Sequence, residues 1–117
     1  MTEKELLERT KQFALRVIKL VNALPDNATG RAIGNQLIRS GTSVAANYRA
    51  ACRGRSKAEF IAKLGTVEEE ADESCLWLEL IIESELMPAG LVMSLLKEAK
   101  EITAIMAASK MSARKNR

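Results

Sequence analysis

The fold of this chain is decided by residues 36–50, which read QLIRSGTSVAANYRA, together with RSKAEF at residues 55–60. In the first segment, apolar side chains recur every three to four residues, which is the spacing of one helical face. Gly54 separates the segments, and we predict that it ends the first helix in a left-handed conformation. Ser56 and Glu59 form the capping-box pattern that begins another helix. The stretch therefore predicts two consecutive helices joined by a tight turn.

The same periodicity predicts a helix before this pair. Thr2 and Glu5 form a second capping box, and Pro25 ends a first helix over residues 2–24. Residues 26–30 then form a turn, and the second helix runs to about Cys52. Gly34 and Gly41 lie seven residues apart on one face of this second helix. A glycine inside a helix costs about 1 kcal/mol, so this pair predicts a close approach to a neighbouring helix.

Two further helices are expected towards the C-terminus. The third covers residues 57–86, and a turn at residues 87–90 leads to a fourth, with Pro88 in its first turn. Periodicity fades after Ser109, so residues 1–109 are expected to form the bundle and residues 110–117 a flexible basic tail. Because short connections make successive helices antiparallel neighbours, we predict an all-α, antiparallel up-down-up-down four-helix bundle.

The composition agrees with a single helical domain. The chain has 117 residues, of which 47% are hydrophobic and only 3% aromatic, a mixture that favours helix over strand. No apolar run is long enough to span a bilayer. The N-terminal residues MTEKE are charged and unlike a signal peptide. We therefore expect a cytoplasmic protein with no membrane partner.

The absence of histidine narrows the possible chemistry. It excludes Ser-His and Cys-His nucleophiles and the histidine-containing zinc and di-iron sites. The acidic run at residues 68–73 suggests a metal site, but a di-iron bundle needs histidine beside such glutamates. Cys52 and Cys75 are expected roughly 25 Å apart along the hairpin, too far for a disulfide. We predict a protein that is not an enzyme and has no catalytic residues, metal or cofactor.

The chain resembles a bacterial family of small four-helix-bundle proteins, whose founding members are encoded by intervening sequences inside 23S rRNA genes. The most specific parts are residues 36–50, residues 55–64 and the acidic run that ends in WLEL at residues 77–80. The match extends from the turn at Pro25 to the fourth helix. Members of this family have no agreed biochemical activity, and the resemblance implies a ring-shaped homopentamer. A related branch, the accessory variability determinant proteins of diversity-generating retroelements, associates with nucleic acid and a reverse transcriptase.

Charge is unevenly distributed along the chain. No acidic residue occurs between Asp26 and Glu59, whereas the formal net charge of the whole chain is only +3. Bases of the second helix fall within roughly 80° on a helical wheel, opposite the apolar stripe. They predict a basic ridge that contacts the phosphates of a nucleic-acid backbone. Basic residues of the following loop and of the C-terminal tail are expected to add to these contacts. The candidate nucleic-acid-binding residues are Arg31, Arg39, Arg49, Arg53, Arg55, Lys57, Arg114, Lys115 and Arg117.

An alternative interpretation uses these charges for assembly. The third helix carries an outward acidic face, so the basic helix of one subunit can lie beside the acidic helix of the next. Small polar residues on one flank of the second helix are expected to hydrogen-bond across a helix pair or a subunit interface. Trp77, beside two glutamates, is a candidate interface anchor or an edge-of-core residue. The candidate interface or register residues are Ser40, Ser43, Asn47, Glu70, Glu73 and Trp77.

Two functions follow. The first is a non-catalytic accessory protein that binds the backbone of RNA or DNA with low sequence specificity. The second is a self-assembling interaction scaffold that docks a protein partner and binds no nucleic acid. The first predicts basic side chains exposed on the assembled ring, and the second predicts the same side chains buried against acids.

Overall fold

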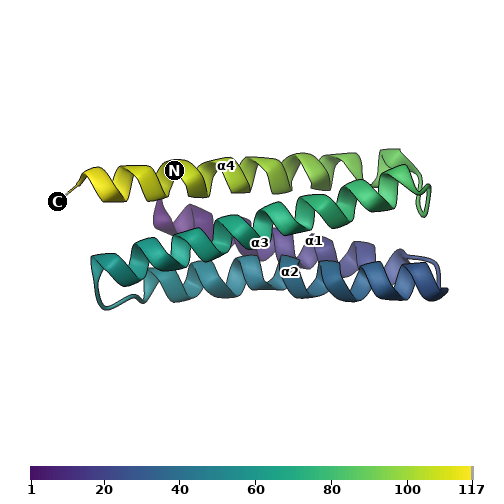
Figure 1. The fold of residues 1–117 in the computed structure, drawn as a ribbon, viewed down its shortest axis with the longest axis horizontal. Coiled ribbons are helices and arrows are strands. Elements are labelled where there is room, and N and C mark those ends of the chain that lie inside the picture. Colours follow the sequence, from purple (N-terminus) through teal and green to yellow (C-terminus); the bar gives the residue numbers. More distant parts are fainter. Residues whose placement is uncertain (117) are drawn as a thin grey trace.

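The computed structural model describes residues 1–116 and contains four long helices (Figure 1). No strand occurs in that part of the chain, so the predicted all-α, four-helix fold is confirmed. None of the helices within residues 1–116 combines the length and apolar character needed to cross a membrane. The elements are α1 (Glu3–Ala23), α2 (Ala28–Cys52), α3 (Lys57–Glu83), the short 3₁₀ helix η1 (Ala89–Leu91) and α4 (Met93–Lys115).

The helices lie side by side in an elongated bundle with extents of 49 × 20 × 19 Å. Figure 1 shows the α1–α2 and α3–α4 connections at one end, and the α2–α3 connection and the C-terminus at the other. α3 packs against both α2 and α4, and α1 packs mainly against α2. α1 and α3 therefore occupy opposite corners of the bundle, which leaves an outer face of each open to solvent.

The core is built from the apolar stripes that the periodicity predicts. Each fully buried aliphatic or aromatic side chain contributes about 1.5–3 kcal/mol relative to an exposed one. The largest of these side chains come from all four helices, and they include Phe13, Val17, Leu37, Val44, Leu64, Leu78, Ile81, Ile102 and Met106.

The two glycines of α2 allow close packing against α1. A Cβ atom at Gly41 would lie 2.8 Å from both Cγ atoms of Val17. A Cβ atom at Gly34 would lie 3.3 Å from Cγ1 of Val21. The predicted close approach is therefore confirmed, and its partner is α1.

The helices α1, α2 and α3 each begin with a side-chain cap. Thr2 Oγ1 accepts a hydrogen bond from the Glu5 amide at 3.1 Å, and Asn27 Oδ1 accepts one from the Gly30 amide at 2.8 Å. Ser56 Oγ accepts from the Glu59 amide at 3.1 Å, as its capping box predicts. The Glu59 carboxylate, however, accepts from the Arg55 amide rather than from the amide of Ser56.

The predicted left-handed conformation at Gly54 is wrong. No glycine among the described residues has a positive φ, and the amide of Gly54 donates to the Ala51 carbonyl at 3.0 Å in a right-handed turn. The left-handed residue is instead Glu85, with φ 57°, just after α3. The amide of Leu86 donates to the Ile81 carbonyl at 3.1 Å, which is the bond of a Schellman motif. This motif ends α3 at Glu83, three residues before the expected boundary.

The start and the end of α4 also differ from the expectation. Pro88 precedes η1 and is not in the first turn of α4, which begins at Met93. The helix continues past Ser109 through Lys115, and in this segment Lys110 Nζ lies 2.8 Å from Glu68 Oε1 of α3. Residues 110–115 are therefore helical rather than an irregular tail. Arg117 lies outside the described residues.

Candidate nucleic-acid interface

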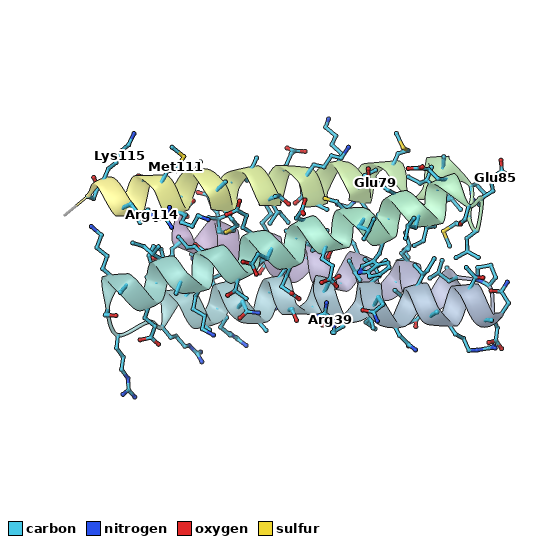
Figure 2. The ribbon with its side chains drawn as sticks, viewed as in Figure 1. Arg39, Glu79, Glu85, Met111, Arg114 and Lys115 are labelled. Atoms are coloured by element: carbon cyan, nitrogen blue, oxygen red, sulfur yellow. The ribbon has the colours of Figure 1, made fainter. Side chains whose placement is uncertain are left out.

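Basic side chains gather at the end of the bundle that carries the α2–α3 connection. Arg49 lies in the last turn of α2 and Arg53 is the C-cap of that helix. Arg55 lies in the connection and Lys57 begins α3, and all four side chains are exposed. The C-terminal end of α4 reaches the same end of the molecule and brings Arg114 and Lys115 with it (Figure 2). We call these residues the basic end: Arg49, Arg53, Arg55, Lys57, Arg114 and Lys115.

An open groove between α1 and α2, about 960 Å³ in volume, extends from the basic end. Its basic walls are Lys4 and Lys11 on α1 and Arg49 and Arg53 on α2. Two acids, Glu3 and Glu8, share the lining, so the charged residues of the groove sum formally to +2. The groove is apolar between its charged walls, where it is lined by Leu7, Ala14, Ala45 and Ala46.

Lys4 and Lys11 were missed by the reasoning from the sequence. They lie seven residues apart and therefore project from the same face of α1. That spacing is a detectable signal, but it gains meaning only once α1 is known to pack beside the C-terminal half of α2. The tertiary structure places Lys4 and Lys11 in the same groove as Arg49 and Arg53.

Arg31 and Arg39 do not belong to the basic end. Arg31 lies in the first turn of α2, at the opposite end of the bundle, and its Nη1 is 2.8 Å from Asp26 Oδ1. Arg39 lies midway along α2 (Figure 2). Its Nη1 is 3.0 Å from Glu70 Oε2 of α3, and its Nη2 pairs with Glu73 of the same helix. A phosphate would have to compete with these carboxylates for the Arg39 guanidinium.

Glu73 connects Arg39 to Trp77. Trp77 is half-buried against the core, and its Nε1 donates to Glu73 Oε2 at 3.1 Å. This hydrogen bond, followed by the ion pair with Arg39, lowers the pKa of Glu73, while the partner carboxylates raise the pKa of Arg39. Glu70, Glu73 and Trp77 thus form one cluster with Arg39 along the α2–α3 seam of a single chain.

The small polar residues of α2 have different partners. Ser40 Oγ is 2.8 Å from Ser74 Oγ of α3 in a hydrogen bond between two buried side chains. This bond crosses a helix pair, as one of the two expected arrangements requires. Asn47 Nδ2 donates to the Ser43 carbonyl of its own helix at 2.9 Å.

The two cysteines and Tyr48 are further groups with a shifted pKa among the described residues. Residues 1–116 hold no cluster of three potential metal ligands. Cys52 and Cys75 are free thiols, and burial raises the pKa of each, which disfavours the reactive thiolate. Burial likewise raises the pKa of Tyr48. The two thiols and the phenol are therefore held in their neutral forms, which are the less nucleophilic ones.

Comparison with known proteins identifies the family. The family model described as 23S rRNA-intervening sequence protein matches residues 2–108. None of the curated proteins compared with the chain gives a significant match. Among solved structures, the chain is similar to a protein with unknown function from the S23 ribosomal protein family of Bacteroides thetaiotaomicron VPI-5482. The two share 31% sequence identity with a TM-score of 0.87, over 95% of this chain and 99% of that one.

The comparison confirms the resemblance carried by residues 36–50, 55–64 and 77–80. The family match spans all four helices and stops at residue 108, before the last turns of α4. The chain belongs to the family of 23S rRNA-intervening sequence proteins.

Proposed function

We propose that this protein is a non-catalytic accessory protein of the bacterial cytoplasm that binds RNA or DNA with low sequence specificity. The contacts are made by the basic end and by the lysines of the α1–α2 groove. Such a protein holds the phosphate backbone through lysine and arginine and reads little sequence.

One observation carries this proposal. The fold brings together basic side chains that are far apart in the sequence. Lys4 from α1, Arg49 and Arg53 from α2, and Lys115 from α4 all lie towards one end of the bundle. Arg49 and Arg53 form no ion pair within residues 1–116, so their charge is available to a ligand. The groove lining follows α1 from Glu3 to Ala14, roughly 17 Å at 1.5 Å per residue.

The assembly forms part of the same proposal. We propose that the bundle is antiparallel, up-down-up-down, and that five copies form a ring. The reversal of chain direction at each connection in Figure 1 supports the antiparallel order. The family resemblance supports the pentamer. A ring repeats the basic end five times and thereby multiplies weak phosphate contacts through effective concentration.

A second candidate function is the interaction scaffold without nucleic-acid binding. Its supporting observation is the pairing of Arg39 with Glu70 and Glu73 of the same chain, which engages part of the α2 charge with carboxylates. In this function, Arg49 and Arg53 are covered by acids of another chain and are inaccessible to phosphate.

Fluorescence anisotropy tests the proposal. A labelled RNA of about 30 nucleotides and the equivalent DNA are titrated with protein at several salt concentrations, and the slope of log K against log salt counts the phosphate contacts. The double variant R49E/R53E is expected to reduce the magnitude of this slope by about 1–2. The control is R31E, a single charge reversal at the opposite end of the bundle, which is expected to change the slope little.

The outcomes separate the two functions. A slope that flattens in R49E/R53E but not in R31E supports the basic end as the binding site. Equal effects of both variants contradict this location and indicate only a response to net charge. Absence of binding to either polymer at low salt overturns the nucleic-acid proposal and favours the scaffold.

A further inference from the structure

The last turns of α4 lie outside the part of the chain that matches the family. The family match ends at residue 108, whereas α4 continues to Lys115. Residues 109–116 contain three bases, Lys110, Arg114 and Lys115, and no acid. Figure 2 shows Arg114 and Lys115 at the C-terminal end of α4, where both side chains are exposed. We call residues 109–115 the α4 extension.

One ion pair connects the α4 extension to α3. Lys110 Nζ lies 2.8 Å from Glu68 Oε1, and the two side chains are only 24% and 28% exposed. This oxygen of Glu68 is buried, and among residues 1–116 the Lys110 ammonium is the one cation that contacts it. The aliphatic part of Lys110 passes over Gly65 of α3, with its Cδ 3.9 Å from the position that a Cβ atom would take there. Loss of the ammonium would leave a buried carboxylate oxygen without a partner, which is unfavourable.

Other contacts of the α4 extension with the bundle are sparse. Met106 is the last fully buried residue of α4, and Lys110 alone among the described residues 107–116 forms an ion pair. An open hollow of about 470 Å³ lies between the extension and Phe60 of α3, and Ser112 and Ala113 line its α4 side. A helical segment this short is marginal in water without tertiary contacts. The pair between Lys110 and Glu68 is therefore the main polar contact available to fix the extension.

We propose that Lys110 is a positioning residue, which through its pair with Glu68 holds Arg114 and Lys115 at the basic end for contact with the phosphates of a nucleic acid. This assignment rests on the proposed function and adds to it a binding element outside the family match. Bases that are already in place contact phosphates without the entropic cost of ordering their segment on binding. The phosphate-binding surface then extends from the α1–α2 groove, across the α2–α3 connection, to α4.

Glu68 distinguishes positioning from a general effect of charge. As an isolated negative charge, its carboxylate repels phosphate, and its removal would strengthen binding. As the partner of Lys110, the same carboxylate orders two bases, and its removal weakens binding although the net charge of the protein rises by one unit. The two effects have opposite signs in the variant E68Q.

Fluorescence anisotropy with the labelled RNA and DNA measures this difference. E68Q is expected to bind about 2–5-fold more weakly than the wild type, in proportion to the strength of a partly exposed ion pair. The matched control is E69Q, which changes the net charge equally at an exposed acid without an ion pair among the described residues. It is expected to bind at least as tightly as the wild type. The charge exchange E68K/K110E keeps the net charge and the pair, and is expected to restore most of the affinity.

Hydrogen exchange of the free protein, followed by mass spectrometry, reports on the position of the α4 extension itself. The amides of residues 110–115 are expected to exchange about 2–5-fold faster in E68Q than in the wild type or E69Q, because the last turns of α4 open more often. The variant R114Q/K115Q leaves the ion pair intact and is expected to retain the wild-type exchange. It is expected to reduce the magnitude of the slope of log K against log salt by about 1–2, at about 0.9 per lost phosphate contact.

Each result has a separate consequence. Equal affinities of E68Q and E69Q, or unchanged exchange of the extension in E68Q, overturn the positioning role of Lys110. A salt slope that R114Q/K115Q leaves unchanged overturns the α4 extension as a binding element, even where the slope still depends on Arg49 and Arg53. Absence of binding by the wild type to either polymer at low salt overturns the proposed function and this assignment together, so the failure of each is distinguishable.

Discussion

Ser40 of α2 and Ser74 of α3 form a buried hydrogen bond, with their Oγ atoms 2.8 Å apart. Each hydroxyl also contacts its own helix: Ser40 Oγ is 3.3 Å from the Leu37 carbonyl, and Ser74 Oγ is 2.9 Å from the Glu70 carbonyl. A buried polar pair of this kind fixes the level at which two helices pack, because a shift along the helix axis breaks the hydrogen bond between the two hydroxyls.

We predict that S40A destabilises the protein by about 1 kcal/mol. The double variant S40A/S74A is expected to lose less than the sum of the two single variants, because it removes both members of the pair. Urea unfolding followed by circular dichroism measures these differences. S43A, at a half-buried position on the same flank, is the control; additive losses at positions 40 and 74 would show that the two hydroxyls are not coupled.

Gly41 is predicted to resist enlargement. In G41A the new methyl would lie 2.8 Å from the Val17 Cγ atoms, and valine is stiff, so overpacking outweighs the gain of about 1 kcal/mol in helix propensity. We expect a net loss of about 1–2 kcal/mol in the free energy of unfolding. G65A is the matched control, because its nearest neighbour is Lys110 Cδ at 3.9 Å, and a gain of about 0.5–1 kcal/mol is expected. A stabilising G41A would contradict the tight α1–α2 contact.

Glu85 is the left-handed residue after α3, and glycine suits this conformation better. With φ 57°, the Glu85 backbone carries a steric cost of about 1 kcal/mol that glycine does not have. E85G is therefore expected to raise the thermal midpoint, although the greater freedom of the unfolded chain offsets part of the gain. E85A retains the Cβ atom and is expected to bring no such increase. Thermal unfolding of both variants decides whether a change in the thermal midpoint comes from the backbone conformation or from the lost charge.

The carboxylate of Glu73 is predicted to make stability depend on pH. The Trp77 hydrogen bond and the Arg39 ion pair lower its pKa below the ordinary value of 4.5. The ionised form is therefore favoured in the folded state, so this contribution is present above pH 4.5 and is lost as the pH falls through the lower pKa of the folded protein.

The test compares urea midpoints at pH 7 and at pH 3. The decrease between the two is expected to be smaller in E73Q than in the wild type. E69Q changes an exposed glutamate with no ion pair among the described residues and serves as the control. Equal decreases in all three proteins would remove Glu73 as a source of the pH dependence.

The two thiols are predicted to react at different rates. Burial raises the pKa of both, but Cys75 is buried in the core, whereas Cys52 is half-buried beside the groove. An alkylating reagent at pH 8 should therefore modify Cys52 first, and Cys75 only as the protein unfolds. Mass spectrometry over time, with C52S as the control, measures the order. Rapid modification of Cys75 in the folded protein would contradict its burial.

Local sequence patterns predicted much of the fold because they act within one helical turn. The caps at Thr2 and Ser56 satisfy amides three residues away, and the apolar stripes follow from about 100° of rotation per residue. The helix C-termini were less predictable. Glycine at position 54 suggested a left-handed cap, but tertiary packing placed that conformation at Glu85, where Leu86 packs against the core.

The sequence by itself determined that this chain makes four amphipathic helices, belongs to its family, and lacks the histidine needed for several kinds of catalysis. Only the tertiary structure decided which charges meet. Helical periodicity gives the direction of a side chain around its own helix, but neither the neighbouring helix nor the level along it. For that reason Arg39 was indistinguishable from Arg49 in the sequence, although α3 carboxylates hold the first while the second lines a groove with Lys4.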